Sequence, residues 1–320
     1  MRKTKIALIT ASILIIAGII MVFSALAISK FDVSAFSSEK YTNITHDIEV
    51  DFSDLKIDVA SAKVTIIPTD GKAKVVCSES DKTTFEVTTD GSTLSVTQKN
   101  TGKWYECIGI FGIEAKVSIY LPAKTYGELT VTTASGDIEC EGNVSFEKAG
   151  VVSSSGEISF TDCSIGELSI VTTSGDVEME RTKASTVNIV TSSGEISLDN
   201  IGESDKIILE STSGNIELDH TTSNSVTVGS QSGELNADSM IVHGKLDIST
   251  NSGDVELESC DADEIEINTT SGEIKGSLMT EKIFVTETTS GSIKVPASRT
   301  GGICKIKTVS GDVKIIIKAM

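Results

Sequence analysis

The sequence has few of the residues on which enzymes usually rely. Its 320 residues include three histidines, one tryptophan and three prolines, and aromatic residues make up only 4%. His46, His220 and His243 lie far apart, and the motifs G-x-S-x-G and H-E-x-x-H are absent. A carbohydrate-active β-helix enzyme would need clustered Asp, Arg or Lys and aromatic sugar platforms. We therefore expect a protein that is not an enzyme and that has no cofactor.

Positive charge is also scarce beyond the first 30 residues. Those residues hold four of the 27 lysines and arginines and none of the acids, which leaves 23 bases against 46 acids in the remainder. A net charge of −23 on that part disfavours nucleic acid and anionic lipid headgroups as direct partners. We therefore expect no nucleic-acid partner.

The N-terminus carries a long apolar run. Arg2, Lys3 and Lys5 precede an uncharged stretch over residues 6–28, and Lys30 follows it. At ~1.5 Å per residue a helix of this length crosses a ~30 Å hydrocarbon core, and the charge bias places the N-terminus inside. We expect residues 1–5 to be cytoplasmic, residues 6–28 to form a transmembrane signal-anchor and residues 29–45 to be a tether. The bulk of this single-pass chain would then be extracytoplasmic.

A cleavable signal peptide is the alternative for the same run. Ala25-Leu26-Ala27 resembles a small-residue cleavage site. The apolar stretch is longer than the usual core of about 7–15 residues, which favours the uncleaved anchor.

The dipeptide Ser-Gly recurs ten times with gaps of 19 or 20 residues. Its serines are Ser135, Ser155, Ser174, Ser193, Ser213, Ser232, Ser252, Ser271, Ser290 and Ser310. A period of this regularity is typical of a stacked repeat protein.

Positions counted from each serine alternate with a step of two. Position −6 is apolar in all ten units, position −4 is apolar except at Thr286, position −2 is Thr or Ser, and position +3 is Ile, Val or Leu. This pattern predicts a strand of about seven residues, a tight corner, a strand of about four and a looser return. The glycine at +1 indicates a corner that needs positive φ or has no room for a β-carbon.

One unit cannot bury its own apolar stripe, but stacked units can. We predict an all-β fold, a right-handed parallel β-solenoid of about ten 19–20-residue coils over residues 129–320. Residues 46–128 would form an N-terminal β cap that contains a degenerate coil around Leu55, Ile57 and Val64. The hydroxyls at −2 would face inward and bond to backbone or to stacked neighbours.

Two features near the ends of this domain concern partners. An apolar loop inside the cap would either cover the end of the core or contact a partner or the membrane surface. Its residues are Trp104, Tyr105, Ile108, Ile110 and Phe111. Lys305, Lys307, Lys314 and Lys318 fall in the last unit, where lysines can protect an exposed edge, so we expect a monomeric rod.

The six cysteines match no metal-binding spacing. Cys140 and Cys304 fall at core positions and fit a role as small buried apolar residues. Disulfides are possible outside the cell, and Cys77 with Cys107 is the least unfavourable pair.

Position +2 is acidic in eight units. Its members are Asp137, Glu157, Asp176, Glu195, Glu234, Asp254, Glu273 and Asp312. Stacked about 4.8 Å apart, they would form an acidic ladder. The ladder could bind a divalent cation such as Ca²⁺, or its acids could simply suit an exposed turn, and we favour the second interpretation.

The repeated pattern resembles that of the bacterial "putative adhesin" family of β-strand-repeat proteins, DUF4097. Residues 168–179 (LSIVTTSGDVEM) and 187–198 (VNIVTSSGEISL) carry the resemblance, which extends over residues 46–320. It implies membrane-anchored or exported proteins of Gram-positive bacteria, and it implies no catalytic residues.

These observations predict a membrane-anchored extracytoplasmic scaffold that contacts a protein or glycan ligand of the cell envelope. An accessory regulator of an envelope-stress sensor is the alternative. A carbohydrate-active β-helix enzyme is the third and weakest hypothesis.

Overall fold

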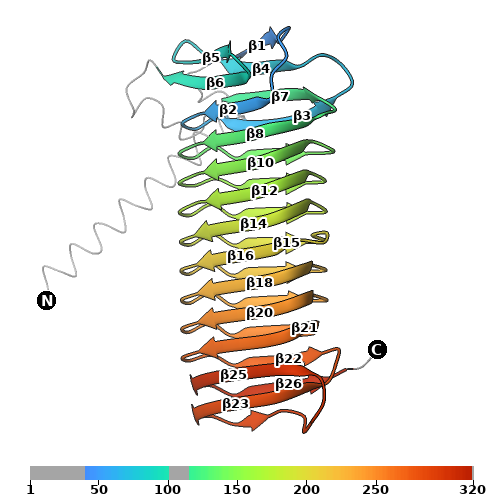
Figure 1. Cartoon of the computed structure of the whole chain (residues 1–320). Helices are drawn as coiled ribbons and strands as arrows, with labels where there is room; N and C mark the ends of the chain where they lie inside the picture. Colours follow the sequence, from blue (N-terminus) through green and yellow to red (C-terminus); the bar gives the residue numbers. More distant parts are fainter. Residues whose placement is uncertain (1–39, 101–114, 319–320) are drawn as a thin grey trace, which may run out of the picture.

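The computed structural model describes residues 40–100 and 115–318, and these form an all-β rod of stacked coils (Figure 1). The predicted parallel solenoid of about ten coils is confirmed, and its right-handedness stays a prediction. The expected anchor over residues 6–28 lies outside the described residues. Within the described ranges, no helix has the length and apolar character needed to cross a bilayer.

Each coil places one long strand in one parallel sheet and one short strand in a second. The long-strand sheet contains β8 (Thr125–Thr132), β10 (Ser145–Val152), β12 (Ser164–Val171), β14 (Lys183–Thr191), β16 (Lys206–Ser211), β18 (Thr222–Ser230), β20 (Ile241–Thr250), β23 (Lys282–Ser290) and β25 (Gly302–Ser310). The short-strand sheet contains β9 (Ile138–Glu141), β11 (Ile158–Thr161), β13 (Val177–Glu180), β15 (Ile196–Asp199), β17 (Ile216–Asp219), β19 (Leu235–Asp238), β22 (Ile274–Leu278), β24 (Ile293–Lys294) and β26 (Val313–Ile317). Strand β21 (Val255–Thr269) runs through both sheets.

The core lies between the two sheets and consists of stacked columns of like residues. Leu168 pairs with Val187 and Ile170 with Ile189, so each predicted core position meets its counterpart in the next coil. These side chains are at most 1% exposed. The apolar parity read from the repeat is therefore confirmed.

The corner glycines are set by space. A β-carbon on Gly194 or Gly214 would lie well inside 3.0 Å of the glycine carbonyl oxygen one coil earlier, and neither residue has a positive φ. Of the two explanations for glycine here, close packing between coils is the correct one at these positions. The corner therefore fixes the distance between neighbouring coils.

In six coils the hydroxyl at position −2 closes the same corner from inside, whereas the hydroxyls of Thr269, Thr288 and Thr308 have no hydrogen-bond partner among the described residues. Thr172 Oγ1 accepts a hydrogen bond from the Gly175 amide at 3.0 Å, and Ser211 Oγ accepts one from the Gly214 amide at 2.9 Å. Their bonds are therefore to backbone within the same coil. This satisfies a buried amide that the turn would leave without a partner.

The return between coils is a defined turn, where we expected a looser loop. Position +7 is left-handed in seven successive coils, and six of these residues are not glycine. They are Gly142, Asp162, Arg181, Asn200, His220, Ser239 and Ser259. The next long strand begins two or three residues later in most coils, but β16 begins six residues after Asn200, and Ser259 lies inside β21.

The N-terminal cap adds seven strands, β1 (Thr42–Asp47), β2 (Asp54–Asp58), β3 (Lys63–Thr69), β4 (Lys74–Glu79), β5 (Thr83–Asp90), β6 (Thr93–Asn100) and β7 (Lys116–Pro122). The degenerate coil is confirmed, because β2 and β3 pair in register with β8 and β9. Strand β1 takes in residues 42–45, which the sequence analysis assigned to the tether. Strands β1, β4 and β5 run antiparallel to their neighbours and end the parallel stack.

The coils do not stack in chain order at either end. Coil β2/β3 lies between β6/β7 and β8/β9, and coil β25/β26 lies between β21/β22 and β23/β24. Figure 1 shows β25 inside β23 at the lower end of the rod. The outermost coil is therefore the one with Thr286 at a core position, where partial exposure makes a polar residue tolerable.

This order corrects the argument made from the C-terminal lysines. Lys305 and Lys307 lie on the penultimate coil, where they pair with Glu264 on one side at 3.0 Å and Glu287 on the other at 3.4 Å. They join neighbouring coils and do not protect a free edge. The terminal strand is β23, whose Val285 is 56% exposed.

Candidate functional site

The predicted acidic ladder forms a column beside the Ser-Gly corners. Seven of its eight members are exposed, and Asp137 is half-buried. The strands that follow them pair in register, for example Ile158 with both Ile138 and Val177. The structure therefore brings these carboxylates to one edge of the rod.

The ladder alternates between two roles. The short side chain of one coil accepts a hydrogen bond from the backbone amide of the next, as from Asp137 to Glu157 at 2.9 Å and from Asp176 to Glu195 at 2.8 Å. Asn215 does the same for Glu234 at 3.1 Å. Asp or Asn thus caps the backbone and Glu extends into solvent, which explains the order Asp, Glu, Asp, Glu, Asn, Glu, Asp, Glu along the column.

The side-chain amide of Asn215 caps the next backbone amide just as the aspartate carboxylates do. The capping positions of the ladder therefore need an acceptor oxygen and not a negative charge. Within the described residues, the ladder also brings no three metal-binding atoms within coordinating distance of one another. The geometry thus favours the interpretation as an exposed turn. Calcium binding along the ladder, the alternative that the sequence disfavours, stays untested.

The structure does not test the other two contacts considered from the sequence, the apolar loop and the Cys77–Cys107 pair. The loop of Trp104, Tyr105, Ile108, Ile110 and Phe111 lies outside the described residues, as does Cys107. Cys77 is a buried free thiol.

The sequence did not indicate a second thiol pair in the core. Cys163 Sγ lies 3.4 Å from Cys140 Sγ, and both side chains are at most 3% exposed. Cys140 lies in β9, and Cys163 follows β11 in the next coil, 23 residues later. The turn after β11 therefore brings Cys163 against Cys140 of the preceding coil.

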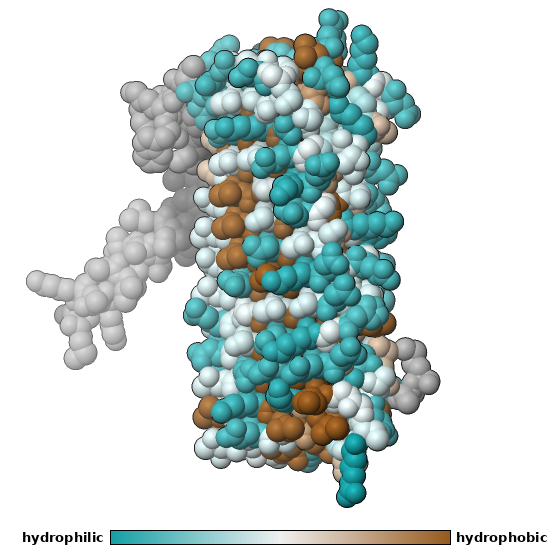
Figure 2. Space-filling view, viewed as in Figure 1, coloured by the Kyte–Doolittle hydropathy of each residue, from teal (hydrophilic) through white to brown (hydrophobic). Residues whose placement is uncertain are grey.

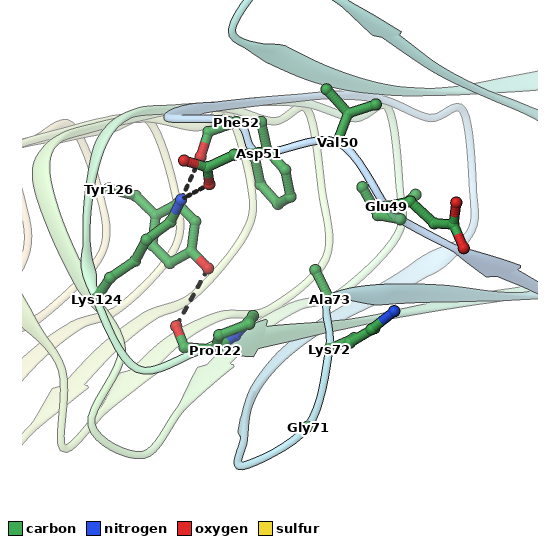
Figure 3. Close-up of a pocket in the computed structure, with 11 residues that line it drawn as sticks. Glu49, Val50, Asp51, Phe52, Gly71, Lys72, Ala73, Pro122, Lys124 and Tyr126 are labelled. Carbon is green, nitrogen blue, oxygen red and sulfur yellow. Dashed lines mark hydrogen bonds and ion pairs between the residues drawn. The ribbon is translucent and has the colours of Figure 1, made fainter.

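A pocket of about 360 Å³ opens at the N-terminal end of the rod (Figure 3). Its walls come from three connections, those between β1 and β2, between β3 and β4, and between β7 and β8. The lining residues are Ile48, Glu49, Val50, Asp51, Phe52, Gly71, Lys72, Ala73, Pro122, Lys124 and Tyr126. The site therefore lies where the chain departs from the repeat.

Lys124 organises one wall of this pocket. Its Nζ lies 2.5 Å from Asp51 Oδ1 and donates to the Phe52 carbonyl oxygen at 2.6 Å. The ammonium also lies 4.9 Å from the ring centroid of Tyr126 and 5.4 Å from that of Phe52, within cation–π range. One cation thus joins the aromatic floor to the charged rim, as Figure 3 shows.

The floor is rigid and apolar, and the rim is polar. Tyr126 and Phe52 are buried with ring centroids 5.6 Å apart, and the Tyr126 hydroxyl donates to the Pro122 carbonyl at 3.1 Å. Burial and then the charge of Asp51 raise the pKa of Tyr126 to about 12. The bond from Lys124 holds the pKa of Asp51 below its ordinary value. At neutral pH the pocket therefore offers a carboxylate and an ammonium above a neutral phenol.

The surface of the rod is mainly polar, with apolar side chains in a stripe along one flank of its upper half and at the end formed by β23–β26 (Figure 2). Ile283 and Val285 on β23 are the exposed apolar residues of the terminal strand. Among the described strands, none pairs with the outer edge of β23, in contrast to the N-terminal end, which antiparallel strands cover.

Sequence reasoning missed the pocket, although a signal was present. All but one of the 14 aromatic residues precede residue 161, and Phe284 is the exception. Columns of aliphatic residues alone can fill the core of a solenoid, so repeated packing does not account for this uneven distribution of aromatic residues. It indicated that the N-terminal end carries something other than repeated packing.

Comparison with known proteins agrees with this architecture. No curated protein matches the chain. A solved structure described as a "putative lipid binding protein" from Parabacteroides distasonis is 19% identical, with a TM-score of 0.53, over 73% of this chain and 96% of that one. A "putative adhesin" from the same species is 12% identical, with a TM-score of 0.49, over 87% and 98% of the two chains.

The first of these likenesses shows the fold alone. The model of the family described as Toastrack DUF4097 matches residues 52–239 and 202–320, which include the cap coil, every Ser-Gly corner and the interleaved C-terminal coils. This chain therefore belongs to the Toastrack DUF4097 family.

Proposed function

We propose that this protein is a non-enzymatic, adhesin-like scaffold, anchored in the cell membrane by residues 6–28, with its rod outside the cell. The rod holds a component of the cell envelope, a glycan or a protein, at its N-terminal end. The observation that carries the proposal is the pocket between the cap connections, which joins an aromatic floor to charges of both signs.

The shape of the pocket supports binding. Its volume of about 360 Å³ lies within the range of small-ligand sites, and its floor is apolar with few polar groups. Glu49 and Lys72 are exposed at the rim and can pair with charges of either sign on a ligand. Within the described residues, the faces of the repeated coils offer no comparable pocket with an aromatic floor and charges of both signs.

The same geometry gives no support for catalysis. The pocket holds neither histidine nor cysteine, and the serines of the repeat are corner residues whose amides bond to the preceding coil. Lys124 is paired with Asp51 and fixed over two rings. These groups can bind and orient a ligand, which is what the proposal requires.

The test compares two substitutions of exposed valines in the full chain. Val50 at the pocket rim is 59% exposed, and Val152 on the long-strand sheet is 53% exposed. Val50→Arg should block the pocket without altering the core, and Val152→Arg adds the same charge elsewhere. Binding is measured against purified peptidoglycan fragments, teichoic acids and envelope proteins.

We expect at least one component to bind wild type and Val152→Arg equally and Val50→Arg at least about tenfold more weakly, a loss of ~1.4 kcal/mol. Equal binding by all three proteins, or no binding by wild type, would overturn the pocket as the site. Protease accessibility of the rod on intact cells tests the orientation separately.

A further inference from the structure

The antiparallel strands β1 and β4 bring three metal-binding side chains to one face of the cap. In their register His46 lies opposite Val75, Ile44 opposite Cys77, and Thr42 opposite Glu79. Directly opposed residues and their neighbours two positions away point to the same side of a sheet. His46, Cys77 and Glu79 therefore share the face that points into the cap.

The three ligand atoms are close together. One imidazole nitrogen of His46, the Cys77 Sγ and a carboxylate oxygen of Glu79 all lie within 4.8 Å of one another. Cys77 is completely buried, and His46 and Glu79 are half-buried, so the group has a route to solvent. This is a compact set of nitrogen, sulfur and oxygen donors.

Two further observations point to a ligand at this position. The Nε2 atom of His46 is buried and has no hydrogen-bond partner among the described residues. A buried polar atom without a partner is costly, so native structures rarely retain one. Glu79 Oε1 accepts a hydrogen bond from the Phe85 amide at 3.0 Å, which orients the carboxylate as supporting partners orient metal ligands.

We propose that His46, Cys77 and Glu79 form a zinc site that pins strand β1 to strand β4. Imidazole, thiolate and carboxylate together are a zinc donor set, and three protein ligands leave a fourth position for water or another small ligand. Modest closure of the three side chains brings them to zinc-binding distances of about 2.0–2.3 Å.

The zinc site would give strand β1 a side-chain anchor, which it otherwise lacks because few of its side chains are buried. Five of its six residues are exposed, and the remaining one is His46. Ile44, the apolar residue opposite Cys77, is itself 41% exposed. The strand is therefore held mainly by its backbone pairing with β4, and a metal bound across the pair would fix it from the side-chain face.

Zinc binding at this site should displace the proton of the Cys77 thiol. A cysteine thiol ordinarily carries its proton at neutral pH. Zinc takes a thiolate, and the proton therefore leaves to solvent as the metal–sulfur bond forms. Binding should release about one proton per zinc ion.

The experiment titrates the full-length protein, stripped of metal with a chelator, with Zn²⁺ and then with Co²⁺. Metal content after desalting gives the stoichiometry, calorimetry in buffers of different ionisation enthalpy gives proton release, and Co²⁺ absorption reports thiolate ligation. The site variants are His46→Gln and Cys77→Ser. Their matched controls are His220→Gln at an exposed turn and Cys260→Ser in the core.

We expect one tightly bound zinc per wild-type chain and per control chain. Each site variant should bind at least about tenfold more weakly, because losing even a supporting partner of a ligand costs about 10–100-fold. Zinc should also slow amide exchange in β1 in wild type but not in His46→Gln. Absence of zinc binding by wild type, or binding that is unchanged in both site variants, would overturn the proposal.

Discussion

The carbonyl oxygen of Gly175 occupies the space in which a β-carbon on Gly194 would lie. This relationship recurs between the glycines of successive coils and leaves no room for any larger residue. The glycine of the Ser-Gly corner therefore sets the spacing between neighbouring coils.

Gly194→Ala should destabilise the rod by about 3 kcal/mol, because the added methyl group meets backbone and cannot be accommodated by a side-chain rotation. Gly229→Ala is the control, since its nearest neighbour is the Glu210 side chain at 3.9 Å. It should change the free energy of unfolding by less than about 0.5 kcal/mol. Urea unfolding of both variants measures this, and equal effects would contradict the spacing role.

Asp176→Asn should be almost neutral, whereas Asp176→Ala should cost about 1 kcal/mol. The reason is that Asp176 Oδ1 accepts the Glu195 amide at 2.8 Å, and Asn215 makes the same bond with an amide oxygen. Urea unfolding of the two variants provides the comparison. If Asn proved as costly as Ala, the charge of the ladder and not its acceptor oxygen would be the stabilising feature.

Cys140 and Cys163 should form a disulfide when the chain refolds with oxidised glutathione. The two thiols, 3.4 Å apart, lose two electrons and two protons, and each glutathione disulfide is reduced to two thiols. Closing a loop of this length should stabilise the rod by about 3 kcal/mol. Peptide mapping by mass spectrometry detects the pair, with Cys260 and Cys304 as the controls that stay free. Recovery of both thiols in reduced form would contradict this expectation.

Asp54 should make stability depend on acidic pH. The Glu128 amide, which donates to its Oδ1 at 3.0 Å, is the main cause that holds the pKa of Asp54 below its ordinary value. The Ser53 and Ser92 hydroxyls donate to Oδ2, so both carboxylate oxygens accept hydrogen bonds, whereas an asparagine has only one acceptor oxygen. A lowered carboxyl pKa stabilises the fold fully above the unfolded value and loses that contribution as pH falls through the folded value. The stability difference between wild type and Asp54→Asn should therefore shrink below about pH 3.8.

Unfolding in urea across this pH range, with Asp90→Asn as an exposed control, measures the effect. A wild-type advantage that stayed constant down to the lowest pH would show that the carboxylate of Asp54 plays no part.

The coils themselves could be predicted because the repeat encodes them locally. Leu168, Ile170, Thr172 and Gly175 each perform the role that their positions indicated, and the same holds in the degenerate coil at Leu55. The alternation of apolar residues, the Ser-Gly corner and the core positions depend only on contacts within one repeat unit and with its neighbour. A single sequence carries that information.

The order of the coils at the ends could not be predicted, because every coil satisfies the same template and can pair with any other. What decides the order is which coil tolerates exposure, and Thr286 and Ser292 marked that coil as the exceptions in otherwise regular rows. The pocket was missed for a related reason. Phe52, Lys124 and Tyr126 meet through the interleaved cap, which no local pattern encodes.

The interleaved ends impose a sequence of events on a chain that emerges from its N-terminus. Strands β23 and β24 pair only with β25 and β26 among the described strands, so they stay unpaired until residues 302–317 have been made. Strands β2 and β3 likewise wait for β6 to β9. The middle of the rod can grow coil by coil during synthesis, while the coil of β23 and β24 can pair only after β25 and β26 have been made.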